Sequence, residues 1–272
     1  MINERVYLRQ GNDKVYLDTY VVDEKNAIGP RQAIIVFPGG AYVALAQHEG
    51  EKIALNYVAA GINAFVLKYS IRGTNPDMRY PMPQVDASNA IKYVKDNAER
   101  FNIDPDQVYV LGFSAGGHLA STMGTIWHRK EIYDAAEPME YGYNKPAGMI
   151  LCYPVITPHP ETGHTGSFKY LLGDDATMEE MEKLSSDKNV DEKTCPAFIW
   201  HTAADNAVPV KSSLLMAEAM DNYKIPFELH VYPKGHHGIG YPDGYGELMY
   251  ADPHAATWMP LSIEWIKENK NK

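Results

Sequence analysis

The chain has 272 residues, of which 45% are hydrophobic and 22% are charged. This composition suits a single large α/β domain with a sizeable core, and it excludes wholesale disorder. The formal net charge is -10, so the surface would repel the phosphate backbone of nucleic acids and anionic membranes. We therefore expect neither nucleic acid nor a membrane as a partner.

The N-terminal stretch MINERVYLRQGNDK (1–14) is polar from its third residue and lacks the apolar core of a signal peptide. No run approaches the roughly 18 apolar residues that a membrane-spanning helix needs. Cys152 and Cys195 lie within or at the start of apolar, strand-like runs, which predicts two reduced core cysteines rather than a disulfide. We expect a cytoplasmic protein.

Apolar runs and helical spacing alternate through the first half of the chain. The first predicted strand is VYLDTYVVD (15–23), an edge strand. The second is AIIVFPGGAY (33–42), which breaks at its Pro-Gly-Gly. The third is NAFVLKYS (63–70), which is apolar without alternation, as expected for a parallel strand covered on both faces. Helical spacing predicts helices over residues 49–61 and 85–101.

The second half continues the alternation. The predicted strands span 108–113, 148–156, 197–202 and 227–233, and two of the predicted helices span 114–127 and 261–269. Between 157 and 193 the pattern lapses, which predicts a loop or a small helical cap over the sheet edge. The whole pattern predicts an α/β fold with a mainly parallel sheet and helices on both faces. We find no internal repeat, so we expect one domain over residues 1–272 with an insertion at 157–193.

A serine surrounded by small residues lies where the strand at 108–113 gives way to a helix. Gly112-Phe113-Ser114-Ala115-Gly116 fits the G-x-S-x-G pattern of a nucleophile elbow. In such an elbow the serine has a strained backbone, and side chains two residues away would collide with the neighbouring strand and helix. The hydroxyl of Ser114 would then lie above the sheet at a helix N-terminus, where backbone N–H groups favour negative charge.

A serine hydroxyl needs a base, and the base needs a group that orients it. Asp205 follows the strand at 197–202, and His236 and His237 follow the strand at 227–233, so either histidine can be the base. The adjacent pair also suggests a metal site, but neighbouring residues rarely point at one ion and no Cys or carboxylate stands at ligand spacing. We predict no metal site.

An oxyanion hole is the third requirement of this chemistry. The turn FPGGAY (37–42) follows the strand that starts at residue 33, where hydrolases place a glycine-rich turn whose N–H groups face the substrate. Gly40 or Ala41 should donate one N–H, and Ala115 should donate the other.

With these residues in place, the chain resembles the α/β-hydrolase superfamily, in particular its acetyl esterase, xylan esterase-like and hormone-sensitive-lipase-like branch. The resemblance covers nearly the whole chain from about residue 33, through FPGGAY (37–42), HEGE (48–51), LGFSAGGHLA (111–120), PVIT (154–157), LLGD (171–174), LSSDKNV (184–190), HTAADNAVP (201–209) and YPKGHHGIG (232–240).

The resemblance implies that Ser114 is the nucleophile, Asp205 the acid and His237 the base, with His236 at a variable position. The oxyanion turn departs from the fuller HGGG form, because Phe37-Pro38 replaces its start and Ala41 its last glycine. The implied chemistry is two-step ester hydrolysis without a metal or an organic cofactor.

The expected substrate is a small-molecule ester with a short acyl group, such as an acetylated xylo-oligosaccharide or another acetylated sugar. The loop at 240–260 is rich in Tyr and Trp, whose faces suit sugar rings, and the predicted substrate contacts are Tyr42, Tyr241, Tyr245 and Trp258. The alternatives are a generic short-chain carboxylesterase and an amide or formamide hydrolase of the same fold. Exposed aromatic loops also leave room for a homodimer.

Other polar residues suggest structural roles. Asp86 is expected to cap a helix or face its dipole. Glu49 and Glu51 are expected to lie near a helix N-terminus, and contact with the rim of the site is the alternative. His118, His201 and His230 fall within predicted helices or strands and are expected to be packed residues with satisfied hydrogen bonds.

Overall fold

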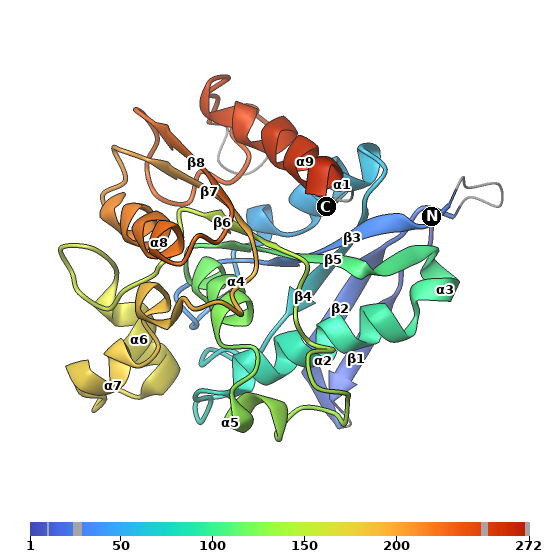
Figure 1. Ribbon diagram of the computed structural model, residues 1–272, viewed down its shortest axis with the longest axis horizontal. Helices are drawn as coiled ribbons and strands as arrows, with labels where there is room; N and C mark the ends of the chain where they lie inside the picture. The colour runs from blue at the N-terminus through green and yellow to red at the C-terminus, as the bar shows by residue number, and fades with distance from the viewer. Residues whose placement is uncertain (10, 24–28, 246–249, 270–272) are drawn as a thin grey trace.

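The computed structural model describes residues 1–9, 11–23, 29–245 and 250–269. Within them, one sheet contains the strands β1 Arg5–Arg9, β2 Asn12–Tyr20, β3 Arg31–Phe37, β4 Asn63–Lys68, β5 Ile103–Phe113, β6 Met149–Cys152, β7 Ala197–Thr202 and β8 Phe227–Tyr232. Their order across the sheet is β1-β2-β4-β3-β5-β6-β7-β8 (Figure 1).

Helices connect these strands. The α-helices are α1 Glu51–Ala59, α2 Met82–Asp96, α3 Ala98–Phe101, α4 Ala115–Thr125, α5 Lys130–Tyr133, α6 Thr165–Leu172, α7 Met178–Glu182, α8 Lys211–Asn222 and α9 Trp258–Asn269. Short 3-10 helices are η1 Gln47–Glu49, η2 Ser186–Asn189 and η3 Ala255–Thr257. None of the helices in the described part of the chain is long and apolar enough to cross a bilayer.

Strands β4, β3, β5, β6, β7 and β8 run parallel, and β1 and β2 pair antiparallel to their neighbours. This confirms the predicted fold class. The prediction of an edge strand at 15–23 was wrong, because β2 is bonded on both sides and β1 forms that edge. The sequence of β1, RVYLR, is short and mostly exposed, so it gives little hydrophobic signal.

Successive residues of the central strands pack into two separate cores. In β3, Ile35 faces the core shared with α2, α4 and α8, whereas Ile34 and Val36 face the core shared with α1 and α9. Figure 1 shows these two groups of helices on opposite sides of the sheet. Both faces are covered, which explains why the parallel strands are apolar at nearly every position.

Some element boundaries differ from the prediction. The helix predicted at 85–101 begins earlier, at Met82, and is interrupted at Asn97 before α3. The strand predicted at 148–156 ends at Cys152, because Tyr153 has a left-handed backbone (φ 35°) and Pro154 has no N–H to pair. The last helix begins at Trp258 rather than at 261.

The segment 157–193 is helical, as one of its two predicted forms, and contains α6, α7 and η2. Its apolar side chains Phe168, Leu171, Met181 and Leu184 are buried in the core that lies over α4. The segment therefore packs onto one end of the main fold through its own hydrophobic face, beside α4 and α8 (Figure 1).

Asp86 does not have the predicted role of a helix cap. It lies in the second turn of α2, is completely buried, and accepts hydrogen bonds from Arg9 Nε at 2.6 Å and from the Ser70 N–H at 2.8 Å. Burial raises the pKa of its carboxyl group, and the Arg9 guanidinium opposes that rise. Asp86 thus ties the edge strand β1 to α2.

We predict that Asp86→Ala lowers the free energy of unfolding by about 3 kcal/mol, because it removes one partner of a buried ion pair. Asp18→Ala is the matched control. Its partner Arg5 is 48% exposed, so the loss there should stay below about 1 kcal/mol. Urea unfolding of the two variants measures the difference, and equal losses would contradict the buried-pair interpretation.

Candidate active site

Ser114 lies at the sharp bend between β5 and α4. Its backbone has φ 53° and ψ -117°, a conformation that residues other than glycine rarely adopt. The N–H of Ser114 donates to the Cys152 carbonyl at 3.0 Å, and its carbonyl accepts from Val155 at 3.0 Å. These bonds to the chain after β6 hold the bend in place.

The glycines around Ser114 are required by close backbone contacts. A Cβ atom on Gly112 would lie 1.9 Å from the carbonyl oxygen of Gly116. A Cβ atom on Gly116 would lie 2.1 Å from the carbonyl oxygen of Phe37 in β3. Any side chain at these positions would push the helix away from the strands, as the sequence pattern predicts.

The structure brings Ser114, His237 and Asp205 together in one hydrogen-bonded row. The Ser114 Oγ lies 2.8 Å from His237 Nε2, and His237 Nδ1 lies 2.7 Å from Asp205 Oδ2. The other candidate base, His236, turns away, with its Nδ1 bonded to the His237 carbonyl and its ring against Tyr250. The geometry therefore selects His237 over His236 as the neighbour of Ser114.

Asp205 is held by donors on both of its oxygens. Its Oδ1 accepts from the N–H groups of Ala207 and Val208, each at 2.9 Å. Burial works against ionisation, but the hydrogen bonds from His201 and His237 and the N–H of Val208 outweigh it, so the pKa of Asp205 lies below its usual range. Asp205 is therefore ionised beside His237.

His201, predicted only as a packed strand residue, also supports Asp205. Its Nε2 donates to the Val208 carbonyl at 2.9 Å and lies 3.3 Å from Asp205 Oδ2, while its Nδ1 bonds the Ser213 hydroxyl at 2.8 Å. The ring is fully buried with satisfied hydrogen bonds, as expected. Its contact with Asp205 comes from the spacing of four residues across the end of β7, which the sequence analysis did not use.

The turn after β3 has an unusual backbone. Gly40, Ala41 and Tyr42 all have positive φ angles, of 128°, 56° and 63°. Among the residues that the structure describes, the N–H groups of Gly40, Ala41 and Ala115 donate to no protein oxygen. These groups include both alternatives for the first predicted oxyanion donor, Gly40 and Ala41, and the second, Ala115, and a strained turn that leaves amides unpaired suits such a site.

A cavity of about 270 Å³ contains the predicted centre. It is lined by Gly40, Ala41, Ala46, His48, Glu49, Ser114, His164, Ala207, Val208, His237 and Gly238. Most of these residues follow the carboxyl ends of β3, β5, β7 and β8, the edge at which open α/β sheets bind their ligands. His164 is different, because it comes from the segment 157–193.

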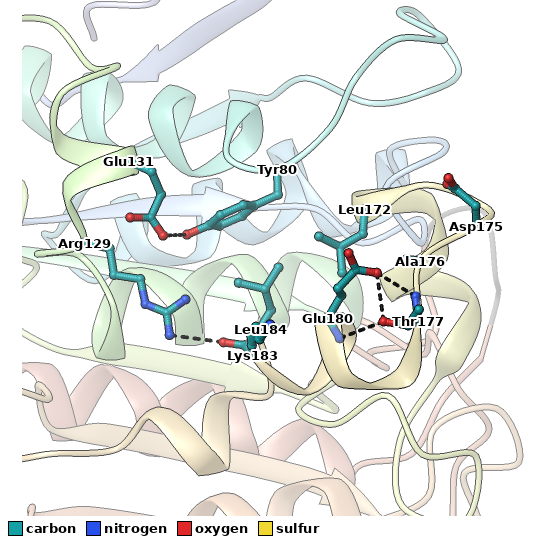
Figure 2. Close-up of a pocket in the computed structure, with 10 residues that line it drawn as sticks. All are labelled: Tyr80, Arg129, Glu131, Leu172, Asp175, Ala176, Thr177, Glu180, Lys183 and Leu184. Atoms are coloured by element: carbon teal, nitrogen blue, oxygen red, sulfur yellow. Dashed lines mark hydrogen bonds between the residues drawn. The ribbon is translucent and has the colours of Figure 1, made fainter.

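A larger hollow of about 520 Å³ lies beside α7 and contains none of the predicted site residues (Figure 2). Several of its polar side chains bond one another or the backbone. The Tyr80 hydroxyl donates to Glu131, and Thr177 and Glu180 form the capping box of α7. We therefore attribute the polar residues of this hollow to packing of the segment 157–193 against the main fold.

Glu49 belongs to the site, although the sequence suggested contact with its rim only as an alternative. It is 2% exposed, accepts the Gly39 N–H at 2.7 Å, and accepts the Tyr153 hydroxyl at 2.5 Å. The Tyr153 oxygen in turn accepts the Gly240 N–H at 2.9 Å. Glu49 therefore connects the turn after β3, the end of β6 and the loop that carries His237. Burial raises the pKa of its carboxyl group.

Two of the predicted aromatic substrate contacts are wrong. Tyr42 is fully buried, and its hydroxyl bonds His118 Nδ1 at 2.8 Å. Trp258 is also fully buried, stacks on Trp200, and donates to the Gly240 carbonyl at 3.1 Å. Both rings are buried beneath the loops and stabilise them, so neither ring has an exposed face that could contact a sugar.

The other two predicted contacts lie away from the cavity. Tyr241 packs edge-on against Trp258 and lies near Lys52, and Tyr245 is 80% exposed. Neither lines the cavity around Ser114. Residues 246–249 of the same aromatic loop lie outside the described residues.

Of the other two histidines that were predicted to be packed residues, one agrees with the prediction and one differs from it. His118 is buried and bonded at both nitrogens, to Tyr42 and to the Leu184 carbonyl, and burial lowers its pKa to about 4. His118 is therefore a packed residue, as predicted. His230 packs against Phe198 and Tyr232 with its Nε2 2.6 Å from Glu228, but it is half-buried on β8 rather than a core residue.

Comparison with known proteins shows the family of this chain. The BD-FAE family model matches residues 17–220. The chain belongs to the BD-FAE family. This agrees with the resemblance to acetyl esterase and xylan esterase-like α/β-hydrolases.

Among curated proteins, "Endo-1,4-beta-xylanase B" of Butyrivibrio fibrisolvens is 38% identical to this BD-FAE chain over 77% of the chain. The chain is 32% identical to "Acetylxylan esterase" of Xylanibacter ruminicola, also over 77% of its length. The chain spans only 32% and 41% of these two relatives.

Solved structures cover the chain more completely. The acetyl ester-xyloside bifunctional hydrolase of Caldicellulosiruptor lactoaceticus has a TM-score of 0.82 at 36% identity, covering 97% of this chain and 96% of that one. The carboxylesterase Cest-2923 of Lactobacillus plantarum has a TM-score of 0.84 at 24% identity, covering 99% of this chain and 98% of that one, which shows a shared fold.

We predict that Glu49 makes the protein less stable as the pH rises. Because its pKa is raised in the folded state, the native protein holds a proton that the unfolded chain releases above about pH 4.3. The free energy of unfolding of the wild type should therefore fall relative to that of Glu49→Gln between pH 4 and the folded pKa. Urea titrations across this range measure the difference, and a difference that is independent of pH would contradict the prediction.

Proposed function

We propose that the protein is a serine carboxylic-ester hydrolase that removes short acyl groups, above all acetyl, from acetylated sugars such as xylo-oligosaccharides. The row Ser114, His237 and Asp205 carries the proposal. A serine within 2.8 Å of a histidine that is itself 2.7 Å from a buried carboxylate is the arrangement that nucleophilic acyl transfer needs.

In the first step, His237 Nε2 takes the proton of the Ser114 hydroxyl as Oγ attacks the ester carbonyl carbon. Asp205 holds the proton on His237 Nδ1, which leaves Nε2 free to accept, and its charge stabilises the imidazolium that forms. The low pKa of Asp205 suits this role, because the carboxylate stays ionised throughout.

The carbonyl oxygen becomes an oxyanion in this step. The unpaired N–H groups of Gly40, Ala41 and Ala115 are the proposed donors, and removal of one such donor typically costs roughly 3 kcal/mol of transition-state stabilisation. Gly40 and Ala41 lie in a turn fixed by Glu49, and Ala115 is the first residue of α4, so these backbone donors need no rearrangement when the charge develops.

Collapse of the tetrahedral intermediate breaks the ester C–O bond, and the imidazolium of His237 returns its proton to the departing alcohol. Water then attacks the acyl group on Ser114, with His237 again as base, and releases the carboxylic acid. Side chains, backbone amides and water supply every step, so the proposed reaction needs neither a metal nor an organic cofactor.

The proposed substrate rests on the relatives and on the cavity. One similar protein is named an acetylxylan esterase, and another is named an acetyl ester-xyloside bifunctional hydrolase. The cavity of about 270 Å³ has alanines at residues 41, 46 and 207 among its lining residues, which leaves room for a small acyl group. The aromatic residues expected to bind the sugar give no support, since two of them are buried in the core.

We predict that Ser114→Ala abolishes hydrolysis of acetylated xylo-oligosaccharides, with kcat falling on the order of 10⁴-fold or more. Asp205→Asn should lose a comparable factor, because it changes the tautomer of His237. His236→Asn is the matched control and should keep nearly full activity, since His236 faces away from Ser114. Acetate release measures all three, and an active Ser114→Ala variant would overturn the serine mechanism.

We also predict a sharp dependence on acyl length, because the cavity is small. Measured on p-nitrophenyl esters, kcat/KM should fall between acetyl and butyryl and again beyond it. Equal rates on acetylated sugars and on butyrate esters of simple alcohols would indicate a generic short-chain carboxylesterase. Faster turnover of N-formylkynurenine than of p-nitrophenyl acetate would indicate an amide or formamide hydrolase.

A further inference from the structure

His164 is the one lining residue of the cavity that comes from the segment 157–193. It precedes α6 as its N-cap, with an extended backbone at φ -142° and ψ 96°. Its ring lies near His237, which contributes to the electrostatic environment of His164. A polar ring that lines this cavity is placed to contact an ester bound there, and the mechanism proposed above gives it no role.

The hydrogen bonds of His164 fix which nitrogen carries its proton. Its Nδ1 accepts the backbone N–H of Ser167 at 3.2 Å and lies 2.9 Å from the Ser167 hydroxyl. A backbone N–H can only donate, so Nδ1 must be unprotonated. Burial, followed by the proximity of His237, lowers the pKa of His164, which favours the neutral ring. The ring proton is therefore on Nε2.

This Nε2–H has no acceptor on the protein among the residues that the structure describes. The carboxyl group of Glu49 also lines the cavity, but its hydrogen bonds are to Gly39 and Tyr153 and none is to His164. The alanine and valine side chains of the cavity offer no acceptor either. A donor held in one tautomer beside the reaction centre is thus left for the substrate.

The chemistry of an acetyl ester limits where the matching acceptor lies. Its carbonyl oxygen is bound by the oxyanion donors, and the rest of the acyl group is a methyl group. The acceptor must therefore belong to the alcohol half, and a sugar provides several hydroxyl and ring oxygens there. A simple hydrocarbon alcohol provides none beyond the ester oxygen itself.

We propose that the Nε2–H of His164 donates a hydrogen bond to an oxygen on the alcohol half of the substrate, so that His164 determines the preference for sugar esters. The inference rests on the proposed esterase function and names a specificity residue within it. It also gives the segment 157–193 a part in substrate choice, through the N-cap of α6.

The test compares two esters of six-membered rings, a monoacetate of methyl β-xyloside and cyclohexyl acetate, which has no further oxygen on its ring. His164→Asn is the main variant. Asparagine is a favoured N-cap that still accepts the Ser167 N–H, so α6 is retained while the ring N–H is lost. His164→Ser, another favoured N-cap, is the second variant, and thermal unfolding verifies that both fold.

His159→Asn is the matched control. His159 lies in the same segment, is 39% exposed, bonds Glu182 at 2.7 Å, and does not line the cavity. The same substitution there should change neither ester by more than a small factor.

We expect kcat/KM of His164→Asn and His164→Ser for the xyloside acetate to fall by roughly three- to tenfold, the usual effect of one neutral hydrogen bond. Hydrolysis of cyclohexyl acetate should change less than about twofold. Equal losses on both esters, or no loss on either, would overturn the role of His164.

A separate outcome concerns the proposed function itself. A wild-type protein that hydrolyses neither ester and is not labelled at Ser114 by a fluorophosphonate would disprove the esterase function, and the role of His164 with it. A wild-type protein that is labelled and hydrolyses cyclohexyl acetate but not the xyloside acetate would leave the serine mechanism intact and disprove only the inference.

Discussion

The contact between the start of α4 and the end of β3 is the constraint on which the rest of the site depends. Gly116 lies so close to the Phe37 carbonyl that no side chain fits, and the absence of a side chain allows α4 to begin directly after the bend at Ser114. Ser114 occupies that bend at φ 53°, a conformation whose cost of roughly 1–3 kcal/mol the surrounding packing must offset. The bend places the hydroxyl and the unpaired Ala115 N–H at the same edge of the sheet.

Two buried carboxyl groups hold the loops around this bend, and their surroundings shift their pKa values in opposite directions. Asp205 receives hydrogen bonds from two backbone amides and contacts two histidines, so its charged form is favoured despite burial. Glu49 receives one amide and one tyrosine hydroxyl, and burial prevails. One carboxylate is thus suited to stabilise an imidazolium, and the other to connect the turn after β3 with the loop of His237.

The sheet topology brings these groups together from distant parts of the sequence. Parallel strands present their carboxyl ends at one edge, so the loops after β3, β5, β7 and β8 meet there although they span about 200 residues of chain. The segment 157–193 packs its apolar residues over α4 and adds His164 to the same cavity. Trp258, at the start of α9, supports this architecture from inside, because it is buried and stacked on Trp200 rather than exposed at the site.

The sequence by itself determined the alternation of strands and helices, the position of Ser114 between small residues, and the chain order of Ser114, Asp205 and the His236–His237 pair. These follow from local periodicity and from steric needs within a few residues. Only the tertiary structure decided which histidine meets Ser114, that Glu49 and His201 support the site, and that Tyr42 and Trp258 are buried. Apart from the contact of His201 with Asp205, which lie four residues apart, these facts depend on contacts between segments far apart in the chain, for which a single sequence carries no local signal.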